Sequence, residues 1–136
     1  MFEAKSFPEE LVSKNILLIE DDKDLLELFV DALIGNGYSV DGFADPLEAL
    51  QIFEQNPYKY DLVLSDIRMP GLTGIDLVKK MKKINPGTNV ALMTAFEVSE
   101  FESEMRELEL SNFMKKPIHI EQLLNVVKLC LEKKKA

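Results

Sequence analysis

Short apolar runs alternate with longer amphipathic segments along this chain of 136 residues. The apolar runs occupy residues 15–22, 38–44, 60–66, 89–95 and 112–118, and the second of them is the weakest. Runs of this length, bounded by acidic, polar or turn-forming residues, are typical of buried β-strands. The chain contains no internal repeat and no low-complexity tract. The pattern therefore predicts strands that are separated by helices.

The segments that follow the runs carry apolar residues at helical spacing. The first helix is expected to end at Gly35 and Gly37. The second is expected to have Asp45 as its N-cap and Pro46 as its first residue, and to continue to about Glu54. Four helices have predicted inward residues. They are Leu26, Phe29, Val30 and Leu33 in the first helix; Leu77, Val78, Met81 and Ile84 in the third, within 74–85; Phe101, Met105 and Leu108 in the fourth, which starts at Val98; and Ile120, Leu123, Leu124, Val127 and Leu131 in the last.

This alternation predicts an α/β fold of the (βα)5 type. Each crossover between parallel strands must be right-handed and must cover apolar sheet surface, so we expect helices on both faces of the sheet. The common doubly wound parallel five-stranded sheet has the flavodoxin-like order 2-1-3-4-5, with a ligand crevice at the carboxyl ends of strands one and three. We expect a single domain over 1–136, with a core at about 14–132 and an N-terminal extension at 1–13.

Chemically reactive side chains occur where the predicted strands end. The first strand ends on Glu20 and Asp21, the third on Asp66, the fourth on Thr94 and the fifth on Lys116. Three acids held close together repel one another unless a cation neutralises them. Two or three carboxylates with room for water suit Mg²⁺, which favours phosphate as a further ligand. The strand ends therefore predict a site for Mg²⁺ and phosphate together.

The same residues suit phosphoryl transfer. Lys116 and Thr94 are placed to meet phosphoryl oxygens, and the Asp66 carboxylate can act as the nucleophile that forms an aspartyl phosphate. An ionised aspartate has no proton to lose, so this reaction requires no separate general base. By contrast, Asp22 and Asp24 are interpreted as residues that stabilise a helix N-terminus.

Composition and charge narrow the class of protein further. The formal net charge of −8 argues against a nucleic-acid-binding surface, because phosphate backbones are bound by clustered lysines and arginines. The apolar runs are too short to span a membrane. The single cysteine, Cys130, cannot form an internal disulfide and is interpreted as a core residue. The N-terminus lacks the pattern of a secretory signal, so a cytoplasmic protein is expected.

Four motifs resemble those of the receiver domain of two-component response regulators. They are "ILLIEDD", "SDIRMPGLTG", "MTA" and "FMKKPI", and the likeness runs from about Lys14 to Glu132. Any one of these motifs is weak evidence, but four in order at strand ends form a specific signal. This resemblance implies a phosphoprotein of a phosphorelay. It is not a classical enzyme, although it would catalyse its own aspartyl phosphorylation and dephosphorylation.

The resemblance implies a role for each residue of the site. Asp66 would be the phosphoacceptor, and Mg²⁺ would be bound by Asp21, Asp66 and the backbone carbonyl of Arg68, with Glu20 acting through water. The family's role for Thr94 and Lys116 is to bind the phosphoryl oxygens. The phosphate would come from a phosphohistidine on a sensor histidine kinase or a histidine phosphotransfer protein. His119, the chain's own histidine, is interpreted as a surface or capping residue.

The resemblance also implies a switch. Thr94 would turn toward the phosphoryl group, and Phe113 would fill the space, which changes the face made by helix four, strand five and helix five. The family pattern implies a cis peptide bond between Lys116 and Pro117. Arg68 and Phe96 stand where the family tunes phosphate lifetime. Where the family usually has a Gly-Ala pair, this chain has Glu109 and Leu110, so an irregular end of helix four is expected.

Three alternatives remain beside the receiver. A haloacid-dehalogenase-like phosphatase also uses an aspartyl nucleophile, but it needs Asp-x-Asp followed by Thr or Ser, which "EDDKDLL" lacks. A flavodoxin-type module needs a phosphate loop rich in Ser, Thr and Gly after strand one, where this chain has acids. A phosphate-independent docking receiver is disfavoured by the intact set of acids, Thr94 and Lys116. The output domain or downstream partner is not predicted.

Overall fold

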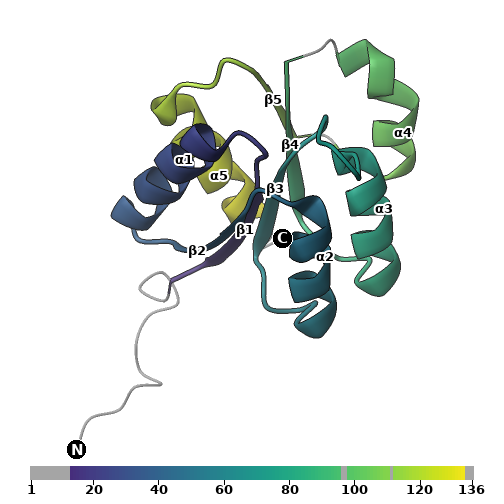
Figure 1. The fold of residues 1–136 in the computed structure, drawn as a ribbon, viewed down its shortest axis with the longest axis horizontal. Helices are drawn as coiled ribbons and strands as arrows, with labels where there is room; N and C mark the ends of the chain where they lie inside the picture. The colour runs from purple at the N-terminus through teal and green to yellow at the C-terminus, as the bar shows by residue number, and fades with distance from the viewer. Residues whose placement is uncertain (1–12, 96–97, 111, 134–136) are drawn as a thin grey trace, which may run out of the picture.

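The computed structural model describes residues 13–95, 98–110 and 112–133, and its centre is a parallel sheet of five strands (Figure 1). The strand order is β2-β1-β3-β4-β5, which confirms the predicted order 2-1-3-4-5. All four neighbouring pairs are parallel. The strands are β1 (Asn15–Ile19), β2 (Ser39–Phe43), β3 (Leu62–Asp66), β4 (Val90–Thr94) and β5 (Phe113–Lys115).

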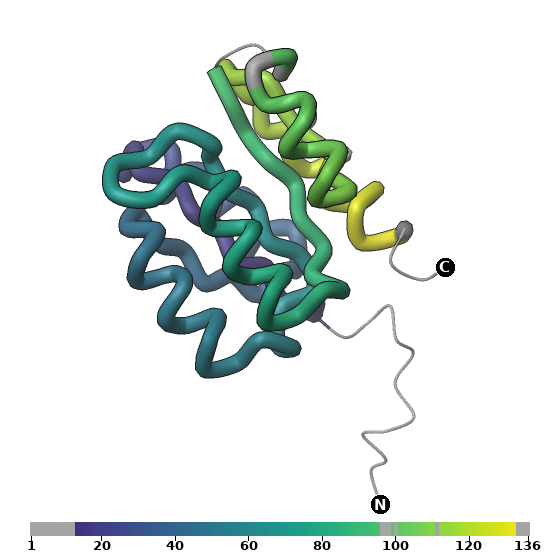
Figure 2. The backbone as a smooth tube through the Cα atoms, turned by 90° about the vertical axis from the view of Figure 1, so that its right-hand side faces the viewer, coloured from purple at the N-terminus to yellow at the C-terminus, as the bar shows by residue number. Residues whose placement is uncertain are grey.

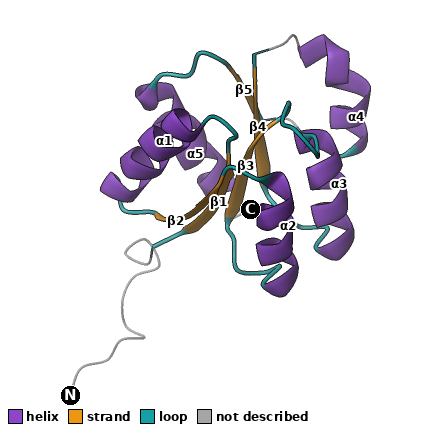
Figure 3. Ribbon diagram, viewed as in Figure 1, coloured by secondary structure: helices purple, strands orange, loops and turns teal. Residues whose placement is uncertain are grey.

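Helices cover both faces of the sheet, as Figure 3 shows by colour. Helices α1 and α5 cover one face, and α2, α3 and α4 cover the other, where α2 and α3 lie side by side (Figures 1 and 2). The helical elements are α1 (Lys23–Gly35), α2 (Pro46–Gln55), α3 (Gly74–Ile84), the short 3₁₀ helix η3 (Val98–Phe101), α4 (Glu102–Glu107) and α5 (Ile120–Lys133). Among the described residues, no helix has the length and apolar character needed to cross a bilayer.

The core consists of two layers because the central strands β1, β3 and β4 bury both of their faces, whereas the edge strands β2 and β5 are partly exposed. In β1, Ile16 and Leu18 pack with the residues of α1 and α5, whereas Leu17 and Ile19 pack with those of α2, α3 and α4. Alternate side chains of a strand point to opposite faces, so a strand covered on both sides must be apolar throughout. This explains why the predicted strands appear as continuous apolar runs. Cys130 is buried in the layer under α1 and α5, as predicted.

The strands are shorter than the apolar runs that predicted them. The first run was predicted to continue to residue 22, but β1 ends at Ile19, and Asp22 serves as the N-cap of α1. The Asp22 carboxylate accepts hydrogen bonds from the backbone N–H groups of Asp24 and Leu25, at 3.0 and 3.2 Å. The fifth run was predicted over 112–118, but β5 covers Phe113–Lys115. In both runs, the residues beyond the strand form the loop at the carboxyl edge of the sheet.

The caps of α2 and α3 fix where these helices start. The Asp45 carboxylate accepts a hydrogen bond from the Leu47 N–H at 2.9 Å, with Pro46 as the first helical residue, as predicted. Thr73 caps α3 by accepting from the Asp76 N–H at 3.1 Å. The prediction that Ile84 points inward is wrong, because this last residue of α3 is 36% exposed. At the end of α3, this side chain lies at the border of the core and is open to solvent.

Helix α4 begins and ends irregularly. The helix predicted from Val98 starts as η3, and α4 itself occupies Glu102–Glu107. Past its end, Glu109 has a φ of 59°, in the left-handed region that glycine favours. The Leu110 N–H donates to the Met105 carbonyl at 2.7 Å, and the Glu109 N–H donates to Arg106 at 3.1 Å. The two bonds form a Schellman motif built without glycine, so the helix keeps the usual hydrogen bonds at its end, and the expected irregularity is limited to the left-handed conformation of Glu109.

The helix stop at Glu109 should gain stability from glycine. Glu109→Gly is expected to raise the free energy of unfolding by roughly 0.5–1 kcal/mol, because it removes the steric cost of a Cβ at positive φ. Urea denaturation followed by circular dichroism measures this difference. The matched control Glu107→Gly removes the same charge inside α4 and is expected to lower stability by about 1 kcal/mol. A loss of stability in both variants would contradict this account of the helix end.

Candidate functional site

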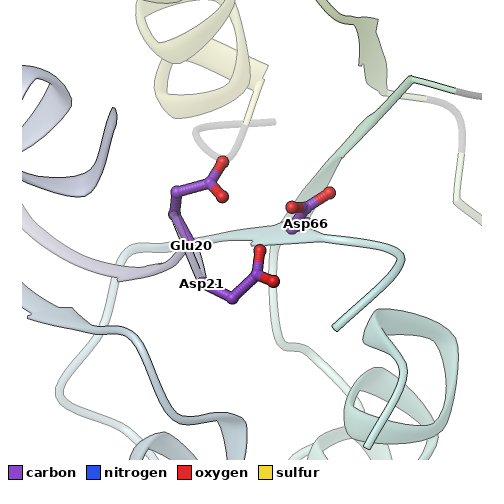
Figure 4. Close-up of side chains that lie close together, drawn as sticks. All are labelled: Glu20, Asp21 and Asp66. Carbon is purple, nitrogen blue, oxygen red and sulfur yellow. The ribbon is translucent and has the colours of Figure 1, made fainter. Parts of the chain in front are cut away.

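Three carboxylates meet at the carboxyl edge of the sheet, as Figure 4 shows. Glu20 and Asp21 follow β1 directly, and Asp66 is the last residue of the neighbouring strand β3. One carboxylate oxygen from each of the three lies within 4.8 Å of the others. Glu20 and Asp66 are buried, whereas Asp21 is exposed. The predicted convergence of acids at this strand edge is therefore present, and one side of it faces solvent.

Lys116 joins two of these carboxylates. Its Nζ atom lies 2.6 Å from Glu20 Oε1 and 2.9 Å from Asp66 Oδ2. The lysine follows β5 and precedes Pro117 through a cis peptide bond, as the motif predicted. Its backbone N–H donates to the carbonyl of Thr94 at 2.7 Å, which attaches the lysine to the end of β4. Residues at the carboxyl ends of β1, β3 and β5 thus form one hydrogen-bonded cluster.

Glu20 is the most enclosed member of the cluster, with no exposed surface. Its Oε1 atom accepts from Lys116, and its Oε2 atom accepts from the backbone N–H of Asp22 at 3.0 Å. Asp22 in turn caps α1, so the turn after β1 is fixed by the same carboxylate that binds the lysine. Both oxygens of this buried acid are satisfied, which a charge removed from water requires.

Burial and mutual repulsion shift the ionisation of the cluster. Burial raises the pKa of the Glu20 carboxyl to about 7, although Lys116 and the Asp22 N–H oppose the rise. Burial also raises the pKa of Asp66, again against the effect of Lys116. Burial alone would lower the pKa of Lys116, but its hydrogen bonds to Glu20 and Asp66 raise it overall. The lysine therefore stays charged, and the acids favour either a shared proton or an added cation.

Thr94 and Phe113 occupy different positions relative to this cluster. Thr94, the last residue of β4, is buried, and its carbonyl holds Lys116. In the sheet, Met93 lies opposite Asp66, so Thr94 stands one residue beyond the acceptor on the neighbouring strand. Phe113 begins β5 opposite Leu92 and is 44% exposed. The structure thus brings Thr94 to the same edge as Asp66 and leaves the ring of Phe113 largely in solvent.

The loop after Asp66 depends on a glycine that sequence reasoning did not single out. A Cβ atom on Gly74 would lie 2.2 Å from the backbone oxygen of Asp66, a distance that no side chain tolerates. The Gly74 N–H also donates to the Ile67 carbonyl at 2.7 Å. The start of α3 therefore packs directly against the backbone of the acceptor. The available signal was the glycine that ends the motif "SDIRMPGLTG".

Arg68 and Phe96 are the two positions at which the resemblance implies tuning of phosphate lifetime. Arg68 is exposed on the loop after β3, and its guanidinium carbon lies 5.7 Å from the centre of the Phe101 ring. Phe96 lies outside the described residues. Sequence reasoning gave no role to Phe101 at this site, because a cation on one loop and a ring in a separate 3₁₀ helix leave no joint pattern in the sequence.

A hollow of about 480 Å³ opens beside the exposed carboxylate. It is lined by Asp21 and Gly71 of the loops after β1 and β3, and by the first residues of α1 and α2, namely Lys23, Pro46 and Leu47. Asp21 is the member of the cluster that lines this hollow, and its carboxylate is exposed. An open position next to oxygen ligands suits a hard cation that retains several water molecules. The donor set of the three acids fits Mg²⁺ on this ground.

Comparisons with known proteins agree with this arrangement. The family model of the response regulator receiver domain matches residues 16–128. The chain is 30% identical over 118 residues to the response regulator receiver protein CpdR of Brucella abortus, covering 87% of this chain and 97% of that protein. It is 31% identical over 118 residues to sporulation initiation phosphotransferase F of Bacillus subtilis, covering 87% and 94%. The chain belongs to the receiver domain family of response regulators.

The structural comparison supports the same family. The structure of a CheY-like response regulator receiver domain protein from Methanospirillum hungatei superimposes with a TM-score of 0.83 at 27% identity, covering 91% of this chain and 98% of that one. Other relatives are longer: the chain spans 56% of the probable transcriptional regulator ycf29 of Porphyra purpurea, to which it is 31% identical. The shared unit is the receiver domain of two-component signal transduction, and this domain is not a classical enzyme.

The shifted ionisation of Glu20 leads to a test. In metal-free protein, its carboxyl is expected to titrate near pH 7 and not near its ordinary value of 4.5, because burial disfavours the charged form. A raised pKa in the folded state means that this group's contribution to the free energy of unfolding is complete below about pH 4.5. That contribution is lost as pH rises to about 7.

Carbon-13 NMR of the side-chain carboxyls, recorded in the presence of EDTA, measures the Glu20 titration. Thermal unfolding over the same pH range measures the change in stability. The control Glu20→Gln is expected to remove the titration and that part of the pH dependence. An ordinary acidic midpoint for Glu20 in the metal-free protein would show that burial and Asp66 repulsion do not govern this site.

Proposed function

We propose that Asp66 of this receiver domain accepts a phosphoryl group from a phosphohistidine on a sensor histidine kinase or a histidine phosphotransfer protein. The observation that carries the proposal is the position of the Asp66 carboxylate, which lies 2.9 Å from Lys116 and shares its site with Glu20 and Asp21. Receiver domains interact with histidine kinases, and this chain retains the acids and the lysine that such a reaction needs. The cognate kinase is not identified by any of these features.

Asp21, Asp66 and the backbone carbonyl of Arg68 would hold Mg²⁺, with Glu20 acting through a water molecule. The ion, when bound, would neutralise negative charge among the carboxylates and the phosphoryl oxygens. The exposed carboxylate of Asp21 beside the open hollow supports this assignment, because Mg²⁺ keeps several waters. Glu20 is less accessible, since both of its oxygens already accept hydrogen bonds.

The transfer itself needs positioning more than acid–base chemistry. An Asp66 oxygen forms a bond to phosphorus while the bond from phosphorus to the donor's imidazole nitrogen breaks, and that nitrogen keeps the electron pair. Lys116 and Thr94 would bind the phosphoryl oxygens and offset the charge that develops there. Attack by water on the aspartyl phosphate later restores the carboxylate and releases phosphate. In this sense the domain catalyses its own phosphorylation and dephosphorylation.

Phosphorylation would act on the face made by α4, β5 and α5. Thr94 would turn toward the phosphoryl group, and Phe113 would move into the space that the threonine leaves. Two local features support this. Thr94 is buried and directly follows Met93, the residue opposite Asp66 in the sheet. Phe113 lies on the adjoining strand, and 44% of its surface is exposed. Phenylalanine has no hydroxyl, so the output contact would be apolar.

The rival functions have weaker support. The sequence after β1 lacks the Asp-x-Asp pattern of a haloacid-dehalogenase-like phosphatase, and the acids there disfavour a flavin phosphate. A phosphate-independent docking receiver would not require the complete set of Asp66, Thr94 and Lys116. We further propose that residues 1–136 act as one receiver domain in the cytoplasm, with no direct contact to nucleic acid or membrane, in keeping with the net charge of −8.

The acceptor assignment predicts a specific mass change. With acetyl phosphate and Mg²⁺, the protein is expected to gain one phosphoryl group, and Asp66→Asn is expected to abolish this gain because an amide cannot act as the nucleophile. Intact-mass spectrometry measures the result. The control Asp76→Asn makes the same chemical change at an exposed carboxylate of α3 and should leave the gain intact. Sustained turnover of phosphomonoesters would favour the phosphatase instead.

The metal assignment predicts a site-specific loss of affinity. Asp21→Asn is expected to weaken Mg²⁺ binding by at least roughly tenfold. Loss of a residue that only supports a metal ligand typically costs about 10- to 100-fold in affinity, and loss of the ligand itself should cost no less. Isothermal titration calorimetry provides the affinity. The control Asp24→Asn removes the same charge from the first turn of α1 and is expected to change the affinity little. Equal losses in the two variants would indicate a general charge effect and not coordination.

A further inference from the structure

A contact between an arginine and an aromatic ring joins the acceptor loop to the start of α4. Arg68 lies two residues beyond Asp66 and is exposed. Its guanidinium carbon lies 5.7 Å from the centre of the Phe101 ring. This separation is inside the range of about 6 Å over which a cation is attracted to the face of an aromatic ring. The loop that carries the acceptor is therefore linked to a segment that follows β4.

Phe101 lies at the junction between η3 and α4, so a change in the position of its ring would affect the start of α4. It is the last residue of η3 and occupies the N-cap position of α4, where its side chain makes no capping hydrogen bond. Its partly buried ring packs against the core layer that contains Met105 of α4. The start of α4 is thus held by packing of this ring and not by a polar cap. A cation on one face of the ring contributes to that packing.

The charges of the site favour a different partner for Arg68 after phosphorylation. Lys116 already binds Glu20 and Asp66, and with a divalent cation it only balances the three carboxylates, so the cluster has no spare positive charge for a phosphoryl group. A phosphoryl group brings a further charge of about −1.5 to −2 and three acceptor oxygens. Charge-assisted pairs between guanidinium and phosphate are among the strongest hydrogen bonds in proteins, whereas an exposed cation–π contact is weak. The exchange of ring for phosphate is therefore favourable.

We propose that Arg68 changes partners when Asp66 is phosphorylated: its guanidinium leaves the face of Phe101 and donates hydrogen bonds to the phosphoryl oxygens. This inference rests on the proposed function of Asp66. It gives the phosphoryl group a second protein cation beside Lys116. It also releases one face of the Phe101 ring, so that the start of α4 responds to phosphorylation by a route separate from Thr94 and Phe113.

A double-mutant cycle tests whether the ring and the phosphoryl group compete for the guanidinium. The probe is beryllofluoride, which stands in for the phosphoryl group on an aspartate, in the presence of saturating Mg²⁺. Phe101→Leu is expected to tighten binding of the probe by about two- to fivefold, since it removes the competing ring. Arg68→Met is expected to weaken it by roughly tenfold, because it removes a charge-assisted donor. In the Arg68→Met background, Phe101→Leu is expected to have no effect.

The matched control is Lys79→Met, which removes the same charge from α3, where Lys79 lies 3.8 Å from Glu104 of α4. Its affinity for beryllofluoride is expected to stay close to that of the unaltered protein. Equal tightening by Phe101→Leu in both backgrounds would overturn the inference. Equal weakening by Arg68→Met and Lys79→Met would overturn it as well, because the effect would then be one of net charge.

NMR gives a direct structural measurement. Nuclear Overhauser contacts between the Arg68 side-chain methylene protons and the Phe101 ring are expected in the free protein and should disappear when beryllofluoride binds. Contacts that persist in the bound state would overturn the exchange of partners while leaving Asp66 as the acceptor. Beryllofluoride that fails to bind, or that binds equally to Asp66→Asn, would remove the proposed function and this inference with it.

Discussion

The pairing of Lys116 with two buried carboxylates is the interaction on which the site depends. Glu20 and Asp66 are both removed from water, and neither is stable as an anion there without a nearby positive charge. The lysine supplies that charge from the end of the edge strand β5, at 2.6 and 2.9 Å. One ammonium cannot neutralise three acids, so the cluster remains poised for a divalent cation and for a group that arrives with it.

The backbone around this cluster is fixed by contacts that leave little freedom. Glu20 accepts from the Asp22 N–H, and Asp22 caps α1, so the first loop is tied to both the sheet and a helix. Gly74 places the start of α3 directly against the Asp66 carbonyl. The Lys116 backbone is held by the carbonyl of Thr94. Such support keeps reacting groups in position without reorganisation, which is the main requirement of phosphoryl transfer.

The region around α4 differs from this rigid frame. Its helix is short, it begins after a 3₁₀ turn, and it ends on Glu109 in a conformation that suits glycine better. Segments with few satisfied caps and some strain open more easily than the core does. Arg68 links this less stable element to the acceptor loop through Phe101. The molecule therefore combines a tightly hydrogen-bonded site with an adjoining short helix that ends on a strained residue.

The sequence by itself determined the order of elements, the doubly wound sheet and the set of reactive residues. Strands buried on both faces must be apolar throughout, and parallel strands bring their carboxyl ends to one edge, so Glu20, Asp21, Asp66, Thr94 and Lys116 had to gather there. Only the tertiary structure decided which of them touch. Lys116 bridges Glu20 and Asp66, Gly74 abuts the acceptor backbone, and Arg68 lies over Phe101. These contacts join residues far apart in the chain, and periodicity records which face a side chain occupies but not its partner across a loop.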